Sequence, residues 1–135
     1  MFFKNFLSRI LSLVLVVVIG LMGCSSTSVE GFTGDYSHDT MEVITNIRTS
    51  FDLPDNSEEK RELIELIRAQ VGDYAARYRR DSKTGGLRSF TTMQTALNAL
   101  AGYYSSYGIR PLPQALQKRL EIQFGRVEFS LYRGI

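Results

Sequence analysis

The chain has 135 residues, of which 44% are hydrophobic and 22% charged, and its formal net charge is +2. This length fits one small domain. Cys24 is the only cysteine, which excludes a disulfide within one copy, so apolar packing must hold the core together.

Residues 1–23 have the order of a bacterial signal peptide. Lys4 and Arg9 are the only charges before Glu30, and a mostly apolar run extends from residue 10 to residue 22. This run is shorter than the roughly 20 residues that a helix needs to span a bilayer. We therefore expect a cleaved signal and not a permanent membrane span.

Residues 21–26, Leu-Met-Gly-Cys-Ser-Ser, resemble the lipobox of bacterial lipoproteins. In that motif a small residue, here Gly23, precedes a cysteine whose thiol carries a diacylglyceryl group. Three acyl chains on Cys24 would give stable membrane anchoring, because one chain alone binds only marginally. The alternative is a secreted protein in which Cys24 is incidental. We favour cleavage between Gly23 and Cys24 and lipid attachment at Cys24.

The charges are divided unevenly along the chain. Removal of residues 1–23 takes away two basic residues and leaves a neutral protein, so the precursor's +2 does not indicate nucleic-acid binding. Within the remainder, residues 24–75 have a net charge of −7 and residues 76–135 of +7. Either the halves pack together and neutralise each other, or a dipolar surface orients the domain on a charged partner.

A tether and a first helix are expected after the signal segment. Residues 24–34 are small and polar without periodicity, which predicts a flexible tether from membrane to domain. Residues 36–51 then have helical periodicity, and Pro54 ends it. The apolar face of this first helix consists of Thr40, Ile44, Ile47 and Phe51.

A second helix is expected after the turn at residues 54–57, where Asn56 and Glu59 have capping-box spacing. Its apolar face consists of Leu63, Ile64, Ile67, Val71, Tyr74, Ala75 and Tyr78. Glu58, Glu62 and Glu65 lie on the opposite side. We interpret these acids as a solvated face and not as a metal site.

A third helix is expected after the loop at residues 81–86, with Ser89 as its cap and Gly108 as its end. Its apolar face consists of Phe90, Met93, Leu97, Leu100, Ala101 and Tyr104. Residues 89–109 carry no charge. A helix surrounded by partners would tolerate this, whereas a surface helix usually would not.

A fourth helix is expected to begin near Pro113, which suits a first turn. Its apolar face consists of Leu112, Leu116, Leu120, Phe124, Val127 and Leu131. No stretch alternates at period two, so we predict no strand. Residues 35–135 therefore predict an all-α domain, an antiparallel four-helix bundle.

No residue pattern indicates catalysis, a metal, another cofactor or a small-molecule substrate. His38 is the only histidine, and no serine has a base beside it. The glycine pair at residues 85–86 lacks the other residues of a phosphate-binding loop. The basic run at residues 77–80 lies at a helix end, where the dipole favours cations, so we do not expect a nucleic-acid partner.

The fourth helix has a second apolar stripe. Ala115, Ile122 and Phe129 repeat every seven residues, roughly 140° from the core stripe. Ile122 and Phe129 therefore belong either to a wide core or to a protein interface. With Tyr103, which lies off the core face of the third helix, and Arg110, they form the candidate partner surface.

Several segments resemble one family. These are residues 77–81 (Arg-Tyr-Arg-Arg-Asp), the uncharged run at residues 89–104 and Arg-Pro-Leu-Pro at residues 110–113, with Thr-Gly-Asp-Tyr at residues 33–36. They resemble the small lumenal photosystem II assembly lipoprotein of cyanobacteria, the Psb twenty-seven family. The resemblance covers nearly the whole mature domain and is most specific at residues 90–101.

The resemblance implies a right-handed four-helix bundle on the lumenal side of the thylakoid membrane. It also implies transient binding to assembly and repair intermediates of photosystem II. The partner would be the lumenal loop of the inner antenna subunit CP-forty-three, bound before the manganese cluster and the extrinsic proteins. The alternative is a generic envelope lipoprotein with a structural or interaction role.

Overall fold

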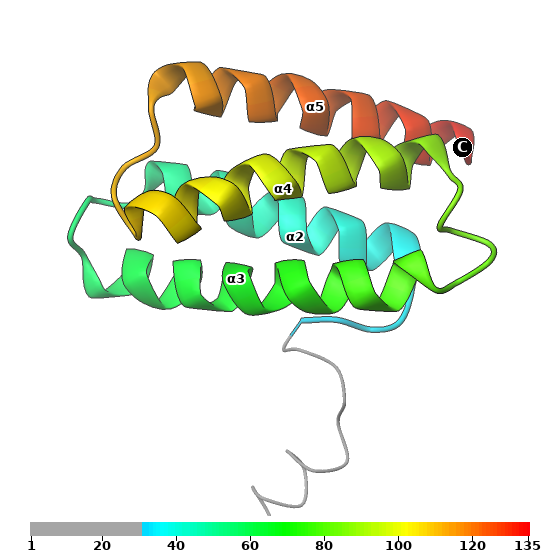
Figure 1. Ribbon diagram of the computed structural model, residues 1–135, viewed down its shortest axis with the longest axis horizontal. Helices are drawn as coiled ribbons and strands as arrows, with labels where there is room; N and C mark the ends of the chain where they lie inside the picture. Colours follow the sequence, from blue (N-terminus) through cyan, green and yellow to red (C-terminus); the bar gives the residue numbers. More distant parts are fainter. Residues whose placement is uncertain (1–30) are drawn as a thin grey trace, which may run out of the picture.

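The computed structural model describes residues 31–135 as four helices that run alternately up and down (Figure 1). They are α2 (Tyr36–Asp52), α3 (Glu58–Arg79), α4 (Arg88–Tyr107) and α5 (Gln114–Arg133). The predicted all-α bundle is confirmed, and the described residues contain no strand. The signal segment, Gly23 and Cys24 lie outside them. None of the described helices is long and apolar enough to cross a membrane.

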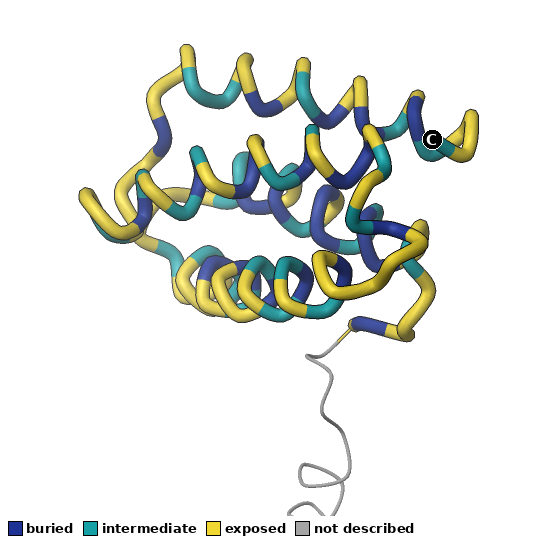
Figure 2. The backbone as a smooth tube through the Cα atoms, turned by 45° about the vertical axis from the view of Figure 1, so that its right-hand side comes forward, coloured by how far each residue is buried: buried dark blue, intermediate teal, exposed yellow. Residues whose placement is uncertain are grey.

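The core lies between the four helices and contains side chains from each of them (Figure 2). Its buried apolar residues are Phe32, Val43, Ile44, Ile47, Ile64, Ile67, Tyr74, Tyr78, Phe90, Met93, Ala96, Leu97, Leu100, Tyr104, Leu112, Leu120, Phe124 and Val127. Five other residues from the predicted apolar faces pack at its edge: Phe51, Leu63, Val71, Leu116 and Leu131. The helical periodicity of the sequence therefore identified the buried side of each helix.

The start of α3 differs from the prediction by one residue. The cap is Ser57, whose hydroxyl accepts the backbone N–H of Lys60 at 3.2 Å. Asn56 instead occupies a left-handed turn position, with φ of 67°. The capping box of Asn56 and Glu59 is therefore wrong. Asparagine tolerates the left-handed region better than most residues, which explains why the turn uses it there.

The start of α4 also differs from the prediction. Ser89 is not the cap, because the helix begins at Arg88 and the residue before it, Leu87, makes no side-chain capping bond. Ser89 lies buried in the first turn, and its backbone N–H donates to the carbonyl of Ile135 at 3.3 Å. The end of the described chain thus supplies an acceptor that a capping side chain would otherwise provide. The predicted end of this helix is confirmed, because Gly108 is its C-cap with φ of 71°.

The segment before α2 is part of the packed domain. Phe32 is buried, and the guanidinium of Arg77 in α3 lies 6.0 Å from the centre of its ring. A Cβ placed on Gly31 would meet the side chains of Glu42 and Gln70, which come from α2 and α3. The expected tether at residues 24–34 is therefore too long. Residues 32–34 are attached to the bundle, because Phe32 is buried and the backbone N–H groups of Thr33 and Gly34 donate to Asp39.

The uncharged helix α4 is not surrounded by the rest of the bundle. Thr91, Thr95, Asn98 and Gly102 are exposed on its outer side. Short polar residues replace charged ones there, which leaves an uncharged strip on the surface. The bundle alone therefore does not explain why this helix lacks charged residues.

Candidate functional site

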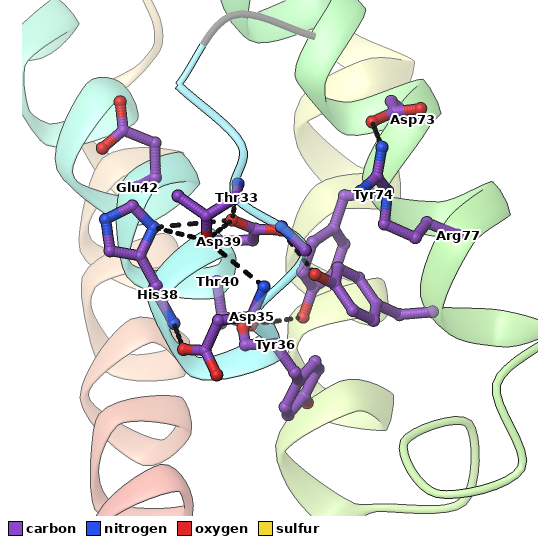
Figure 3. Close-up of polar contacts among 12 residues, drawn as sticks. Thr33, Asp35, Tyr36, His38, Asp39, Thr40, Glu42, Asp73, Tyr74 and Arg77 are labelled. Carbon is purple, nitrogen blue, oxygen red and sulfur yellow. Dashed lines mark hydrogen bonds and ion pairs between the residues drawn. The ribbon is translucent and has the colours of Figure 1, made fainter. Parts of the chain in front are cut away.

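The start of α2 contains a buried carboxylate, Asp39, to which several donors converge (Figure 3). The backbone N–H groups of Thr33 and Gly34 donate to it at 2.8 and 3.1 Å. The hydroxyl of Tyr78 in α3 donates to Oδ2, which also accepts the N–H of Gly34, whereas Thr33 donates to Oδ1. We call these four residues the Asp39 centre. It joins the segment before α2 to both α2 and α3.

The Asp39 centre is arranged to keep its carboxylate ionised. Burial alone would raise the pKa of Asp39, but hydrogen bonds from Tyr78, Thr33 and Gly34 favour the charged form and lower the pKa below its ordinary value of 3.8. Burial, together with the neighbouring Asp39, raises the pKa of Tyr78 above its ordinary value of 10.0. Asp39 is therefore the acceptor and Tyr78 the donor at physiological pH.

Further tyrosines extend this network between the helices. The hydroxyl of Tyr74 lies 2.9 Å from that of Thr40, and the hydroxyl of Tyr36 lies 2.7 Å from that of Ser89. The rings of Tyr74 and Tyr78 are 5.2 Å apart, in a tilted arrangement. Tyr36, Tyr74 and Tyr78 each have a large apolar ring and a hydroxyl that makes a hydrogen bond. Because these hydrogen bonds run between different helices, they connect α2, α3 and α4.

Nothing in this region assembles reactive groups. The described residues contain no group of three or more histidine, cysteine, aspartate or glutamate side chains that could hold a metal. His38 is half exposed, 3.5 Å from Asp39. Glu58, Glu62 and Glu65 are all exposed, which confirms the predicted solvated face. The hydrogen bonds of the Asp39 centre give it a structural role, because they join the segment before α2 to α2 and α3.

A second candidate region lies on the outer side of α5 (Figure 2). The side chains of Ile122 and Phe129 are 58% and 60% exposed. The possibility that a wide core buries them is therefore wrong, and their exposure fits the interface alternative. Both lie on a side of α5 that faces away from its buried residues.

The α5 strip is defined by the exposed residues of this outer side: Lys118, Ile122, Gly125, Arg126, Phe129 and Arg133. Next to it is a hollow of about 420 Å³, lined by Arg88, Thr92, Ile122, Gly125, Arg126, Phe129 and Ser130. The guanidinium of Arg133 lies 5.7 Å from the centre of the Phe129 ring. The region thus combines basic groups, apolar side chains and a depression.

The structure separates the four residues of the candidate partner surface. Arg110 is exposed in the connector before α5, whereas Phe129 lies 15 residues beyond Gln114, about 22 Å along the helix. The half-buried Tyr103 donates its hydroxyl to the carbonyl of Pro111 at 2.8 Å, so it braces that connector. Tyr103 and Arg110 therefore form one patch, and Ile122 and Phe129 another.

The two acids of α5 face α2 and not the strip. Arg48 of α2 binds Glu121 at 3.1 Å and Glu128 at 2.5 Å, and these bonds raise the pKa of Arg48. No ion pair among the described residues joins an acid of α2 or α3 to a base of α4 or α5. Among the described residues, only Asp73 and Arg77 of α3 pair an acid of residues 24–75 with a base of residues 76–135, so ion pairs neutralise little of the charge difference between the two halves.

Sequence reasoning missed three features of these regions. The burial of Asp39 was not predicted. Its hydrogen-bond donors come from other elements, and the sequence around a polar residue does not show which distant groups will bind it. The Arg48 pairs join residues more than 70 positions apart. Gly125 did give a signal, since a glycine inside a helix is unfavourable and needs a reason.

The fold and the two regions together define a class of protein. It is a small helical bundle in which the buried Asp39 binds groups of its own chain, whereas Ile122 and Phe129 are exposed on the outer side of α5, as in a protein-binding module. A family model described as Photosystem II Pbs27 matches residues 11–131. The chain belongs to this family.

Individual relatives agree with this assignment. The chain is 53% identical to the Photosystem II lipoprotein Psb27 of Synechocystis sp., over 99% of this chain and 98% of that one. It is 42% identical to the Photosystem II assembly factor lipoprotein Psb27 of Thermosynechococcus vestitus, over 96% of each. A solution structure of Psb27 from cyanobacterial photosystem II has a TM-score of 0.73 and 50% identity, covering 82% of this chain and 95% of that one.

Proposed function

We propose that this chain is a non-catalytic accessory protein that binds assembly and repair intermediates of photosystem II. The observation that carries the proposal is the match to the photosystem II family over nearly the whole chain. One relative is titled an assembly factor lipoprotein, and a more distant one, from Arabidopsis thaliana and 28% identical, is titled a photosystem II repair protein. The absence of a metal-binding cluster in the described residues is compatible with a binding role.

The protein would be attached by lipid at Cys24 to the lumenal side of the thylakoid membrane. This is supported by the signal and lipobox pattern of residues 1–24 and by two relatives that are titled lipoproteins. Intact mass spectrometry of the processed protein tests it. A mature N-terminus at Cys24 with a thioether-linked lipid is expected, and an unmodified Cys24 would overturn the anchor.

The binding partner would be the lumenal loop of the inner antenna subunit CP-forty-three, met before the manganese cluster and the extrinsic proteins are in place. Two surface patches are available for this contact, one with the half-buried Tyr103 and the exposed Arg110, and one with the exposed Ile122 and Phe129. Anchoring would help a weak interface, since it raises the local concentration of the domain at the membrane.

Affinity capture of the processed lipoprotein from solubilised thylakoid membranes tests the partner. The expected result is recovery of photosystem II core subunits, including the inner antenna subunit, in complexes that lack manganese and extrinsic proteins. Recovery of no core subunit would instead support a generic envelope lipoprotein. Recovery of complete, oxygen-evolving complexes would contradict the proposed timing.

A further inference from the structure

The charged residues of the α5 strip itself are all basic, and the acids Asp52 and Glu121 lie on the α2 side of Ile122. Ile122 and Phe129 are seven residues apart, about 10 Å along the axis of α5. Lys118, Arg126 and Arg133 are exposed along the same side, and none of them has an ion-pair partner among the described residues. Carboxylates of a partner would meet unopposed cations here, because both acids of the helix hold Arg48.

Gly125 has no packing explanation inside the protein. It lies in the middle of α5, where glycine is unfavourable relative to alanine. A Cβ added at this position would find no atom within 4 Å. The missing side chain deepens the hollow between Arg126 and Phe129, which is a site for a partner's side chain.

Several polar groups on the neighbouring surface of α4 already make hydrogen bonds within the chain. The hydroxyls of Thr91 and Thr95 donate to carbonyls of their own helix at 3.2 and 3.0 Å. Asn98 accepts a hydrogen bond from Gln94 at 3.3 Å. A partner that covered these residues would therefore remove few free hydrogen-bond donors from water. A patch with few charges at its centre and basic groups at its rim is also typical of a protein interface.

The position of the N-terminal segment distinguishes a protein partner from a lipid surface. Residues 31–34 bind along α2 and α3, on the far side of the bundle from α5 (Figure 1). Gly31 is seven positions after Cys24, so the chain between their Cα atoms can reach at most about 25 Å. For α5 to contact the lipids that hold Cys24, this short segment would have to pass around the bundle in a nearly fully extended conformation. A protein partner is therefore the better fit for the α5 strip.

We propose that the α5 strip and its hollow bind an acidic protein segment in which an apolar side chain is flanked by carboxylates. The apolar side chain occupies the hollow over Gly125, and the carboxylates lie against Arg88 and Arg126. This inference rests on the proposed function for the identity of the complex, and it adds the surface used and the chemistry of the partner segment.

Intact lipoprotein variants, produced and processed in the native membrane, test the strip. Gly125→Leu fills the hollow, and Gly72→Leu is its control, since Gly72 is exposed on α3 and equally free of contacts. Both variants are expected to raise the melting temperature, because leucine favours a helix. Only Gly125→Leu is expected to reduce capture of photosystem II core subunits. Equal capture by both variants would overturn the use of the hollow.

Charge reversal tests the chemistry. Arg88→Glu with Arg126→Glu is expected to weaken capture on the order of tenfold and to reduce its dependence on salt. Arg61→Glu with Arg68→Glu makes the same change in net charge on α3 and is expected to leave capture unchanged. Similar losses from both double variants would show that net charge alone matters and would overturn the proposal. Circular dichroism verifies that each variant keeps its helices.

Hydroxyl-radical footprinting of Phe129 identifies the occupant. Protection is expected in the captured complex, and not in the protein alone or on vesicles of phosphatidylglycerol and phosphatidylcholine. Protection on vesicles would indicate a lipid surface, and concentration-dependent protection of the protein alone would indicate a second copy; either overturns the proposal. If the wild type captures no photosystem II subunit, the proposed function fails. If it does, and Phe129 stays reactive, only this inference fails.

Discussion

Folded proteins usually bury apolar residues and expose charged ones, and the Asp39 centre and the α5 strip are two exceptions to this distribution. Asp39 is a charged side chain with no exposed surface, whereas Ile122 and Phe129 are large apolar side chains that are more than half exposed. The buried acid is compensated by donors from the segment before α2 and from α3. The exposed apolar residues have no comparable partner within the described part of the chain.

The difference separates stability from binding. A buried carboxylate persists only when hydrogen bonds replace its lost hydration, so the Asp39 centre needs its neighbours to stay in place. An exposed apolar side chain contributes little to folding and is available for contacts with another molecule. Changes at the first region should therefore affect unfolding, and changes at the second should affect binding.

The largest effect is expected from Asp39→Ala. It leaves the Tyr78 hydroxyl and the N–H groups of Thr33 and Gly34 without their acceptor, which should lower the free energy of unfolding by about 3 kcal/mol. Urea denaturation followed by circular dichroism measures this. Asp35→Ala, which removes an exposed helix cap, should lower it by only about 1 kcal/mol. Equal effects of the two variants would refute a special role for Asp39.

Acid should weaken the same region. Because the folded protein lowers the pKa of Asp39 below 3.8, its contribution to stability is present above that pH and is lost as the pH falls through the lower, folded value. The free energy of unfolding should thus decrease below about pH 4 more steeply in the wild type than in Asp39→Asn. Parallel curves for the two proteins between about pH 5 and pH 2 would contradict this prediction.

A smaller effect is expected at the contact between α2 and α5, away from both regions. Arg48→Met removes the ion pairs with Glu121 and Glu128 but keeps the apolar stem. The groups are partly exposed, so the free energy of unfolding should decrease by about 1 kcal/mol, and less at high salt. Arg61→Met, at an exposed position without an ion pair, serves as the control. A salt-independent loss would show that packing, and not charge, is responsible.

The smallest effect on stability is expected from Ile122→Asp with Phe129→Asp. Exposed positions usually change stability by less than about 0.5 kcal/mol each, so helicity and melting should remain nearly unchanged while capture of the partner weakens. Ile67→Asp, which places a charge in the core, should unfold the domain in the same assay. Collapse of the double variant would contradict the exposed position of these residues.

Much of this architecture could be predicted from apolar periodicity. Ile44, Ile67, Leu97 and Phe124 lie in the core because a helix repeats its buried side every three to four residues. Helix starts were harder to predict. Ser57 and Asn56 are both acceptable caps by composition, and only the backbone angles decide which one takes the turn. Ser89 has the composition of a cap but is used for a bond to Tyr36 of another helix.

The sequence by itself determined the four helices, their apolar faces and the resemblance to a photosystem II family, because local periodicity and motif residues are properties of neighbouring positions. Only the tertiary structure decided that Asp39 is buried and that Ile122 and Phe129 are exposed. It also divided the candidate surface into two patches. These outcomes depend on which helices flank each position, and the hydrogen bonds and ion pairs that join distant residues leave no periodic trace along the chain.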